Sequence, residues 1–261
     1  MPESAAPATI IYEQPLNERV RGLLRLEHLF QHVGMCMRDS REWDSRIAVH
    51  MLQEIADLLG RSDLKGELIK ELERHSNCLV AWQKNPAVDG ERLNELLADL
   101  GELLEQLRDP SCQPGQALRQ DELITAIKQR SSIPGGTCNF DLPAYHHWLS
   151  QPADRRFQNI ERWSRDLQII RKGIEFALAM IRNSSNPERC LAHGGFFQKN
   201  LDANASCQLL RVILPASSTF FPEISGSRHR FTIRFLEQTD TRIRPVQASD
   251  DIEFELNCCM L

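Results

Sequence analysis

Hydrophobic residues recur every three or four positions through the first two thirds of the chain, which is the spacing of one face of an α-helix. The first such series follows Pro15, a residue suited to the first helical turn, and continues to Met37. Similar series predict helices over about 43–59, 64–82, 91–108 and 116–130. Gly60, Pro110 and Pro114 mark breaks between them.

The longest amphipathic series lies between Phe157 and Ile181. Its apolar residues step by three and four positions, which predicts a helix about 37 Å long. A bundle core and a dimer seam both show this pattern. The absence of clear charge pairing at the flanking positions favours the bundle core.

Beyond Asn186 the pattern changes from helical spacing to alternation. The chain alternates over 196–201, 207–214, 230–238 and 252–259, and polar or turn-forming residues separate these runs. The early run 9–14, "TIIYEQ", is also strand-like, and a lone strand would leave its backbone groups unpaired, so we expect it to join the C-terminal sheet.

These patterns predict an α+β fold, with an all-helical domain inserted between the first strand and the rest of a mainly antiparallel β domain. The expected β domain comprises residues 9–14 and 186–261. The helical domain comprises 15–185, and residues 1–8 form a flexible N-terminus.

Composition narrows the possible functions. The chain has 261 residues, a formal net charge of −5 and no apolar run near the ~18 residues that a membrane span needs. Its first residues lack a basic start and a hydrophobic signal core, so we expect a cytoplasmic protein that does not bind membranes. The acidic total disfavours non-specific binding to nucleic acid.

The eight cysteines are scattered, and none forms a Cys-x-x-Cys pair of the kind found in zinc or redox sites. We therefore expect reduced thiols, no metal and no cofactor. Dinucleotide, phosphate-loop and zinc-protease signatures are also absent from the sequence.

The segment "SSIPGGTCNFDLPAYHHW", residues 131–148, gathers residue types that could serve catalysis. However, His146 and His147 are adjacent, so on a helix they point about 100° apart and cannot share one metal ion. Asp141 is expected to cap the helix that follows, and Pro134 with the two glycines after it suits a tight turn. The segment is interpreted as a structural corner with exposed polar side chains.

The run "SRHRFTIRF", residues 227–235, separates two kinds of side chain by alternation. One face carries His229, Phe231, Ile233 and Phe235, and the other carries Arg228, Arg230, Thr232 and Arg234. A row of arginines without an acid in the run suits either a solvated face or an anionic partner. Arginine favours carboxylates, because its planar fork binds them through two parallel hydrogen bonds.

Four segments give the chain a resemblance to a known family. They are "QPLNERVRGLLRLEHL" near the start, "QRSSIPGGTCNFDLPAYHHWL" in the middle, "ISGSRHRFTIRFL" in the β region and "FELNCC" near the end. In order and spacing they are similar to those of ZapD, a family of bacterial cell division proteins. The resemblance implies a non-enzymatic homodimer that binds the C-terminal tail of FtsZ and bundles FtsZ filaments at the mid-cell Z-ring.

The resemblance also implies a basic peptide-binding surface. Its expected members here are the strand arginines Arg230 and Arg234 with their neighbour Arg228, together with Arg25, Arg61 and His146. Glu122 departs from the family pattern, since the corresponding position can be basic.

Two other classes of function stay open. The strand arginines could bind nucleic acid instead of a peptide. A small-molecule enzyme could use His146, His147, Asp141 or Cys138 at the domain junction.

Overall fold

The chain has an α+β fold in which the helices lie between the first strand and all later strands, as predicted. The computed structural model describes residues 8–61, 63–83, 85, 88–201, 207–227 and 229–260. Of the N-terminal segment predicted to be flexible, residues 1–7 lie outside these ranges.

Two compact units make up the chain. Residues 1–21 with 179–261 form one, here called the β unit, and residues 22–178 form the other, the helical unit. The sequence predicted domain limits after residues 14 and 185. These limits remain a prediction.

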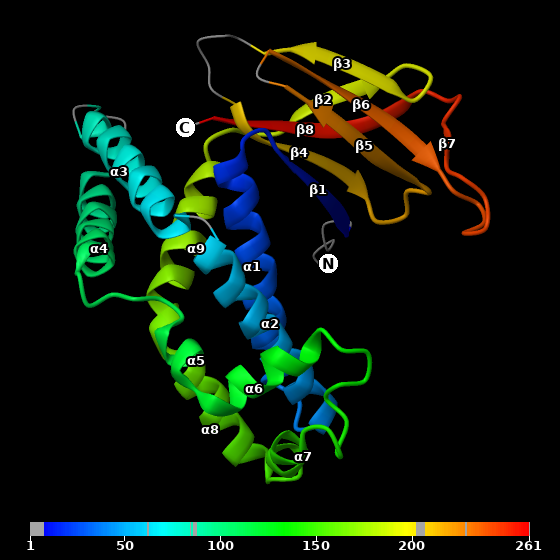
Figure 1. The fold of residues 1–261 in the computed structure, drawn as a ribbon. Coiled ribbons are helices and arrows are strands. Elements are labelled where there is room, and N and C mark those ends of the chain that lie inside the picture. Colours follow the sequence, from blue (N-terminus) through cyan, green and yellow to red (C-terminus); the bar gives the residue numbers. More distant parts are fainter. Residues whose placement is uncertain are drawn as a thin grey trace, which may run out of the picture. The chain divides into compact units, whose positions relative to one another are not determined.

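Figure 1 shows the order of the helices along the chain. Asp63 and Asp89 begin α3 and α4, because their side chains accept hydrogen bonds from backbone N–H groups of the first turn. The helices are α1 (Glu18–Cys36), α2 (Glu42–Arg61), α3 (Leu64–Trp82), α4 (Gly90–Arg108), α5 (Gln116–Gln120), α6 (Glu122–Ser131), α7 (Pro143–Leu149), α8 (Ala153–Ser164), the 3-10 helix η1 (Arg165–Leu167) and α9 (Gln168–Arg182).

Two predicted helices are interrupted. The series over 116–130 divides at Asp121, whose extended backbone ends α5 and whose side chain caps α6 by accepting from Ile124 N at 3.2 Å. The same carboxylate accepts from Trp163 Nε1 at 2.7 Å, so a distant tryptophan helps to fix the break. The series over 157–181 is divided by η1, and its residues Trp163 and Leu167 are buried within the chain, which favours the bundle-core interpretation.

The strands form two antiparallel sheets. Sheet A has the order β1-β4-β8-β2, and sheet B has the order β3-β6-β5, with β7 paired to β6. The pairing of β1 with β4 confirms that the early strand joins the C-terminal sheet. The strands are β1 (Thr9–Pro15), β2 (Glu188–Ala192), β3 (Phe196–Asn200), β4 (Cys207–Pro215), β5 (Phe220–Gly226), β6 (Arg230–Glu237), β7 (Val246–Gln247) and β8 (Ile252–Met260).

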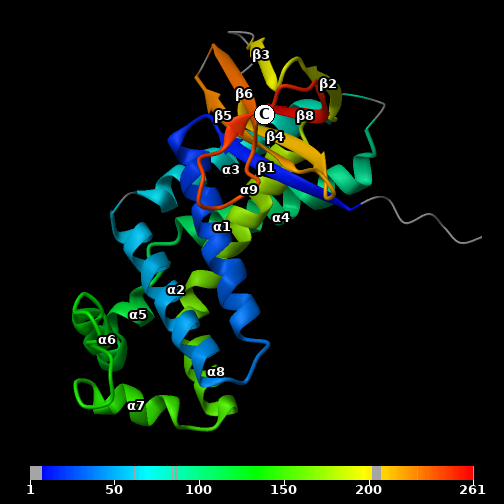
Figure 2. The same cartoon turned by 90° about the vertical axis from the view of Figure 1, so that its right-hand side faces the viewer.

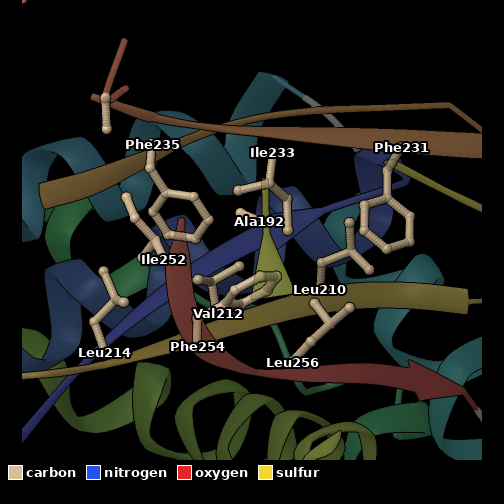
Figure 3. Close-up of a cluster of buried hydrophobic side chains, with 11 residues drawn as sticks. Ala192, Leu210, Val212, Leu214, Phe231, Ile233, Phe235, Ile252, Phe254 and Leu256 are labelled. Atoms are coloured by element: carbon tan, nitrogen blue, oxygen red, sulfur yellow. The ribbon is translucent and has the colours of Figure 1, made fainter. Parts of the chain in front are cut away.

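Side chains from both sheets form the core of the β unit. Figure 3 shows Phe231, Ile233 and Phe235 of β6 pointing toward side chains of β4 and β8. The rings of Phe235 and Phe254 lie 5.0 Å apart between centroids. Burial of each such side chain contributes about 2 kcal/mol, so this layer holds the two sheets together.

A tight turn carries the chain from sheet A to sheet B. Gly194 and Gly195, between β2 and β3, both have positive φ angles, 54° and 68°. A Cβ on Gly195 would also lie 2.6 Å from the backbone oxygen of Ala248, so this position needs glycine.

Three strands were not predicted, namely β2, β5 and β7. In β5, Pro222 lowers the strand signal, because proline cannot donate to a sheet ladder and is tolerated at a sheet edge. The position of β5 at the end of sheet B agrees with that rule.

Candidate functional site

The alternation predicted for the arginine-rich strand is confirmed over residues 230–235. On β6, Phe231, Ile233 and Phe235 are almost fully buried, whereas Arg230 and Arg234 are exposed. The buried row faces sheet A, so the arginines project from the opposite side of sheet B.

Neighbouring strands complete this side of sheet B, here called the outer face. Its three cross-strand rows follow from the register, because residues directly opposite each other point to the same side. The rows are Phe196–Arg234–Glu223, Gln198–Thr232–Ser225 and Asn200–Arg230. Phe196 is 40% exposed, so an apolar side chain lies beside the charged pair.

The two arginines of the outer face differ in their partners. Arg234 forms an ion pair with Glu223 of β5. Arg230 has no acidic partner among the described residues. The run itself contains no acid, as noted from the sequence, but the neighbouring strand provides one. The sequence pattern did not predict β5, so it could not place Glu223 beside Arg234.

Two more residues, Arg228 and His229, stand at the start of the run. Arg228 lies outside the described residues. His229 is exposed, and its backbone N–H donates to Ser227 Oγ at 3.4 Å.

The helical unit carries the other predicted site residues, all of them exposed: Arg25 on α1, Arg61 at the end of α2 and His146 on α7. Leu64 packs against Gly22 of α1. Arg25 follows Gly22 by three residues and Arg61 precedes Leu64 by three residues, so both arginines flank this contact.

His146 lies near the other end of α2. Its neighbour Tyr145 packs under Arg46, whose guanidinium carbon lies 5.2 Å from the ring centroid. Helix positions 46 and 61 are about 22 Å apart, so His146 and Arg61 belong to different places on the helical unit.

Segment 131–148 forms a corner, as expected, although its cap differs from the prediction. Asp141 does not cap α7, whose N-cap is Leu142 with Pro143 following. Instead Asp141 accepts a hydrogen bond from the Cys138 thiol, with a sulfur–oxygen distance of 3.3 Å. A Cβ on Gly136 would lie 2.5 Å from the backbone oxygen of Arg130, which explains a glycine in the turn.

Beside this corner α2 and the turn border a groove of ≈ 460 Å³. Apolar side chains dominate its walls, including Trp43, Ile47 and Ile133, and Trp43 is 68% exposed. Burial raises the pKa of Tyr145, which also lines the groove, to about 12, so its phenol stays protonated near neutral pH. Figure 2 shows α6 and α7 on the same side of α2 in this part of the helical unit.

Glu122, the residue that departs from the family pattern, is exposed in the first turn of α6. A carboxylate there interacts favourably with the positive end of the helix dipole. The acid therefore suits the helix even though it removes a possible cation from the surface.

Nowhere in the described ranges do three His, Cys, Asp or Glu side chains gather in a way that could hold a metal ion. In the same ranges, every helix is too short or too polar to cross a membrane.

Comparison with known proteins identifies the family. A family profile named ZapD and described as a cell division protein matches residues 24–234. The chain belongs to the ZapD family. It is 42% identical over 252 residues to the cell division protein ZapD of Methylococcus capsulatus, covering 97% of this chain and 98% of the relative.

Other ZapD proteins match over similar lengths. Identity is 38% over 256 residues to that of Aromatoleum aromaticum, covering 98% of this chain and 99% of the relative. It is 35% over 254 residues to that of Coxiella burnetii strain RSA 331, covering 97% and 98%. Membership of the ZapD family assigns this protein a role in cell division.

Proposed function

We propose that this ZapD-family protein binds the acidic C-terminal tail of FtsZ on the outer face of sheet B. One observation carries the proposal. Arg230 and Arg234 project from the exposed side of a strand whose other side is anchored in the core. A strand packed against the core fixes the backbone positions of both arginines, which lowers the entropy lost on binding.

The chemistry of the outer face suits an extended acidic peptide. Arg230 and Arg234 are four positions apart, about 13 Å along a strand, and carboxylates four positions apart on an extended peptide have the same spacing. Phe196 offers an apolar contact next to Arg234. Each guanidinium can bind a carboxylate through two hydrogen bonds.

The outer face of sheet A is a poorer match for an acidic tail. It borders a hollow of ≈ 510 Å³ lined by Leu191 and Ile213 and by two carboxylates, Glu253 and Glu255, with only Arg189 as a cation. Like charges would oppose an acidic peptide there.

Filament bundling follows if the protein is a homodimer. Two copies present two tail sites, and many weak contacts along a polymer add up to a strong crosslink. Micromolar affinity at one site, about −8 kcal/mol, is enough. In this proposal the protein is a non-enzymatic crosslinker of FtsZ filaments that acts at the mid-cell Z-ring, without binding nucleic acid or membrane. The exposed Arg25, Arg61 and His146 of the helical unit stay expected members of the basic surface that the family resemblance implies.

The charge-reversed double variant Arg230→Glu/Arg234→Glu tests the site. We expect a loss of at least about 100-fold in affinity for a labelled FtsZ tail peptide, measured by fluorescence anisotropy, because close charged pairs across interfaces contribute about 1.5 to 7 kcal/mol. The free energy of unfolding should fall by only about 1 kcal/mol, because both side chains are exposed, although Arg234→Glu loses the pair with Glu223 and places two carboxylates opposite each other.

The matched control is Arg189→Glu/Arg244→Glu, which makes the same change in net charge at two exposed arginines elsewhere in the β unit. It should keep tail binding. If the site variant folds and binds as the wild type does, the outer face of sheet B is not the tail site. A labelled oligonucleotide in the same assay tests the nucleic-acid alternative, and we expect no binding.

Oligomeric state tests the bundling step separately. Light scattering at micromolar concentration should give twice the chain mass of 29.9 kDa. A monomer that still binds the tail would retain peptide recognition but exclude crosslinking by two sites.

A further inference from the structure

Three half-buried thiols of sheet A pack against the core of the β unit. They are Cys190 of β2, Cys207 of β4 and Cys258 of β8. Because β8 lies between β2 and β4, Cys258 is the central member. The Lys199 ammonium from β3 forms an ion pair with Glu188 at 2.8 Å, and both charges act on Cys190 and Cys258.

Cys207 and Cys258 are neighbours on the core side of sheet A. Cys207 is opposite Met260 in the sheet register, and Cys258 precedes Met260 by two residues, so both thiols point to the same side. A β-bulge between Cys207 and Leu209 shifts the register at this point. The Cys207 thiol donates to the Leu209 carbonyl at 3.7 Å. Each of the two thiols also shifts the pKa of the other, so the two sulfur atoms lie near each other.

The two thiols have opposite electrostatic tendencies. The Cys207 thiol, acting as a donor to a Cys258 thiolate, lowers the pKa of Cys258. Burial and the Glu188 carboxylate oppose this shift, and the Lys199 ammonium adds to it. The interaction with Cys258, together with burial, raises the pKa of Cys207. One member of the pair is therefore suited to nucleophilic attack, and the other holds its proton until a later step.

We propose that Cys258 and Cys207 form an oxidisable dithiol, in which Cys258 reacts with a peroxide and Cys207 closes a disulfide between β8 and β4. In the first step the Cys258 thiolate attacks a peroxide oxygen, the O–O bond breaks and hydroxide leaves. Cys258 is then a sulfenic acid, oxidised by two electrons. In the second step the Cys207 sulfur attacks the Cys258 sulfur, its proton is transferred to the departing hydroxyl group, and water leaves.

The local backbone allows this closure. Diagonal residues in a sheet are typically about 7–8 Å apart, and a disulfide requires Cα atoms within about 7 Å, so a small approach is needed. The bulge lies next to Cys207, and Cys258 lies near the end of β8, where strands move most easily.

Two nearby cysteines are less suited to the reaction. Burial raises the pKa of Cys190, although Lys199 opposes this shift. Cys259 points to the other side of sheet A, where its thiol donates to the Arg182 carbonyl, and burial raises its pKa. This site does not depend on the peptide-binding proposal.

The test uses the full chain and hydrogen peroxide in small excess, followed by digestion without reductant and mass spectrometry. We expect one major crosslink, Cys207–Cys258, that dithiothreitol reverses, and fragmentation distinguishes Cys258 from Cys259. Iodoacetamide at neutral pH should label Cys258 several-fold faster than Cys112. A Cys190–Cys258 crosslink, or peroxide treatment that leaves Cys258 reduced, would overturn the assignment.

Single variants separate the two roles. In Cys207→Ser the sulfenic acid at Cys258 should persist and be trapped by dimedone, whereas Cys258→Ser should lose both the crosslink and the rapid alkylation. Cys112→Ser, in the helical unit, is the matched control and should keep both. Circular dichroism checks that each variant folds. A folded Cys207→Ser variant with no trapped sulfenic acid contradicts the first step.

Discussion

Both sheets of the β unit carry arginine–glutamate contacts on their outer faces, but the two contacts differ in burial. On sheet A, Glu13 accepts hydrogen bonds from Arg182 at 2.8 Å and from Arg211 at 3.0 Å, and the three side chains are only 18–24% exposed. On sheet B, the side chains of Arg234 and Glu223 are 50% and 57% exposed.

This difference in burial separates a structural role from a binding role. Glu13 joins the end of α9 to β1 and β4, and nearby the backbone N–H of Met260 donates to Ser184 Oγ at 2.8 Å. Charges withdrawn from water in this way are costly to separate. The Arg234–Glu223 pair is well solvated, so water or an incoming carboxylate can replace Glu223 at little cost.

The largest expected effect is on stability, at Glu13. The substitution Glu13→Gln removes the negative charge that lies between two guanidinium groups, and we expect a loss of about 2 kcal/mol in the free energy of unfolding by urea, less than for a fully buried pair. The matched control Glu253→Gln, at an exposed position on the same sheet, should change it by less than about 0.5 kcal/mol. Equal effects of the two substitutions would remove the proposed difference between buried and exposed carboxylates.

A smaller effect is expected at Arg182. Its Nε and one terminal nitrogen both donate to Glu13, at 2.8 Å each, and lysine cannot reproduce this fork. Arg182→Lys should therefore lower the free energy of unfolding by about 1 kcal/mol, in line with one lost hydrogen bond. The exposed Arg189→Lys is the control. Unchanged stability in Arg182→Lys would mean that charge alone, without the paired geometry, suffices there.

The smallest effect is expected at Glu223, and it concerns binding. Glu223 competes with a peptide carboxylate for Arg234, so Glu223→Gln should raise affinity for the FtsZ tail peptide roughly threefold, the scale of an exposed ion pair. Stability should change by less than about 0.5 kcal/mol. Anisotropy titrations at two salt concentrations measure the change, which should shrink as salt screens the pair. If the wild type binds the peptide and Glu223→Gln binds equally, Glu223 does not compete.

Local patterns in the sequence determined much of this protein. Helical spacing and alternation predicted the α+β fold, the insertion of the helices after the first strand, and the opposite faces of Phe231 and Arg230. These features depend on residues within a few positions of each other, because side-chain direction repeats with the local backbone geometry. The resemblance to the ZapD family was also evident from short segments in order along the chain.

Only the tertiary structure decided which distant residues meet. Glu223 lies beside Arg234 because β5 pairs with β6 in one register, and Cys207 is a diagonal neighbour of Cys258 because β4 pairs with β8. Trp163 binds Asp121 across the helical unit, and α2 separates Arg61 from the neighbourhood of His146. Strand order, register and helix packing arise from burial summed over the whole chain, and a shift of one residue in register would turn every side chain of a strand to the opposite face.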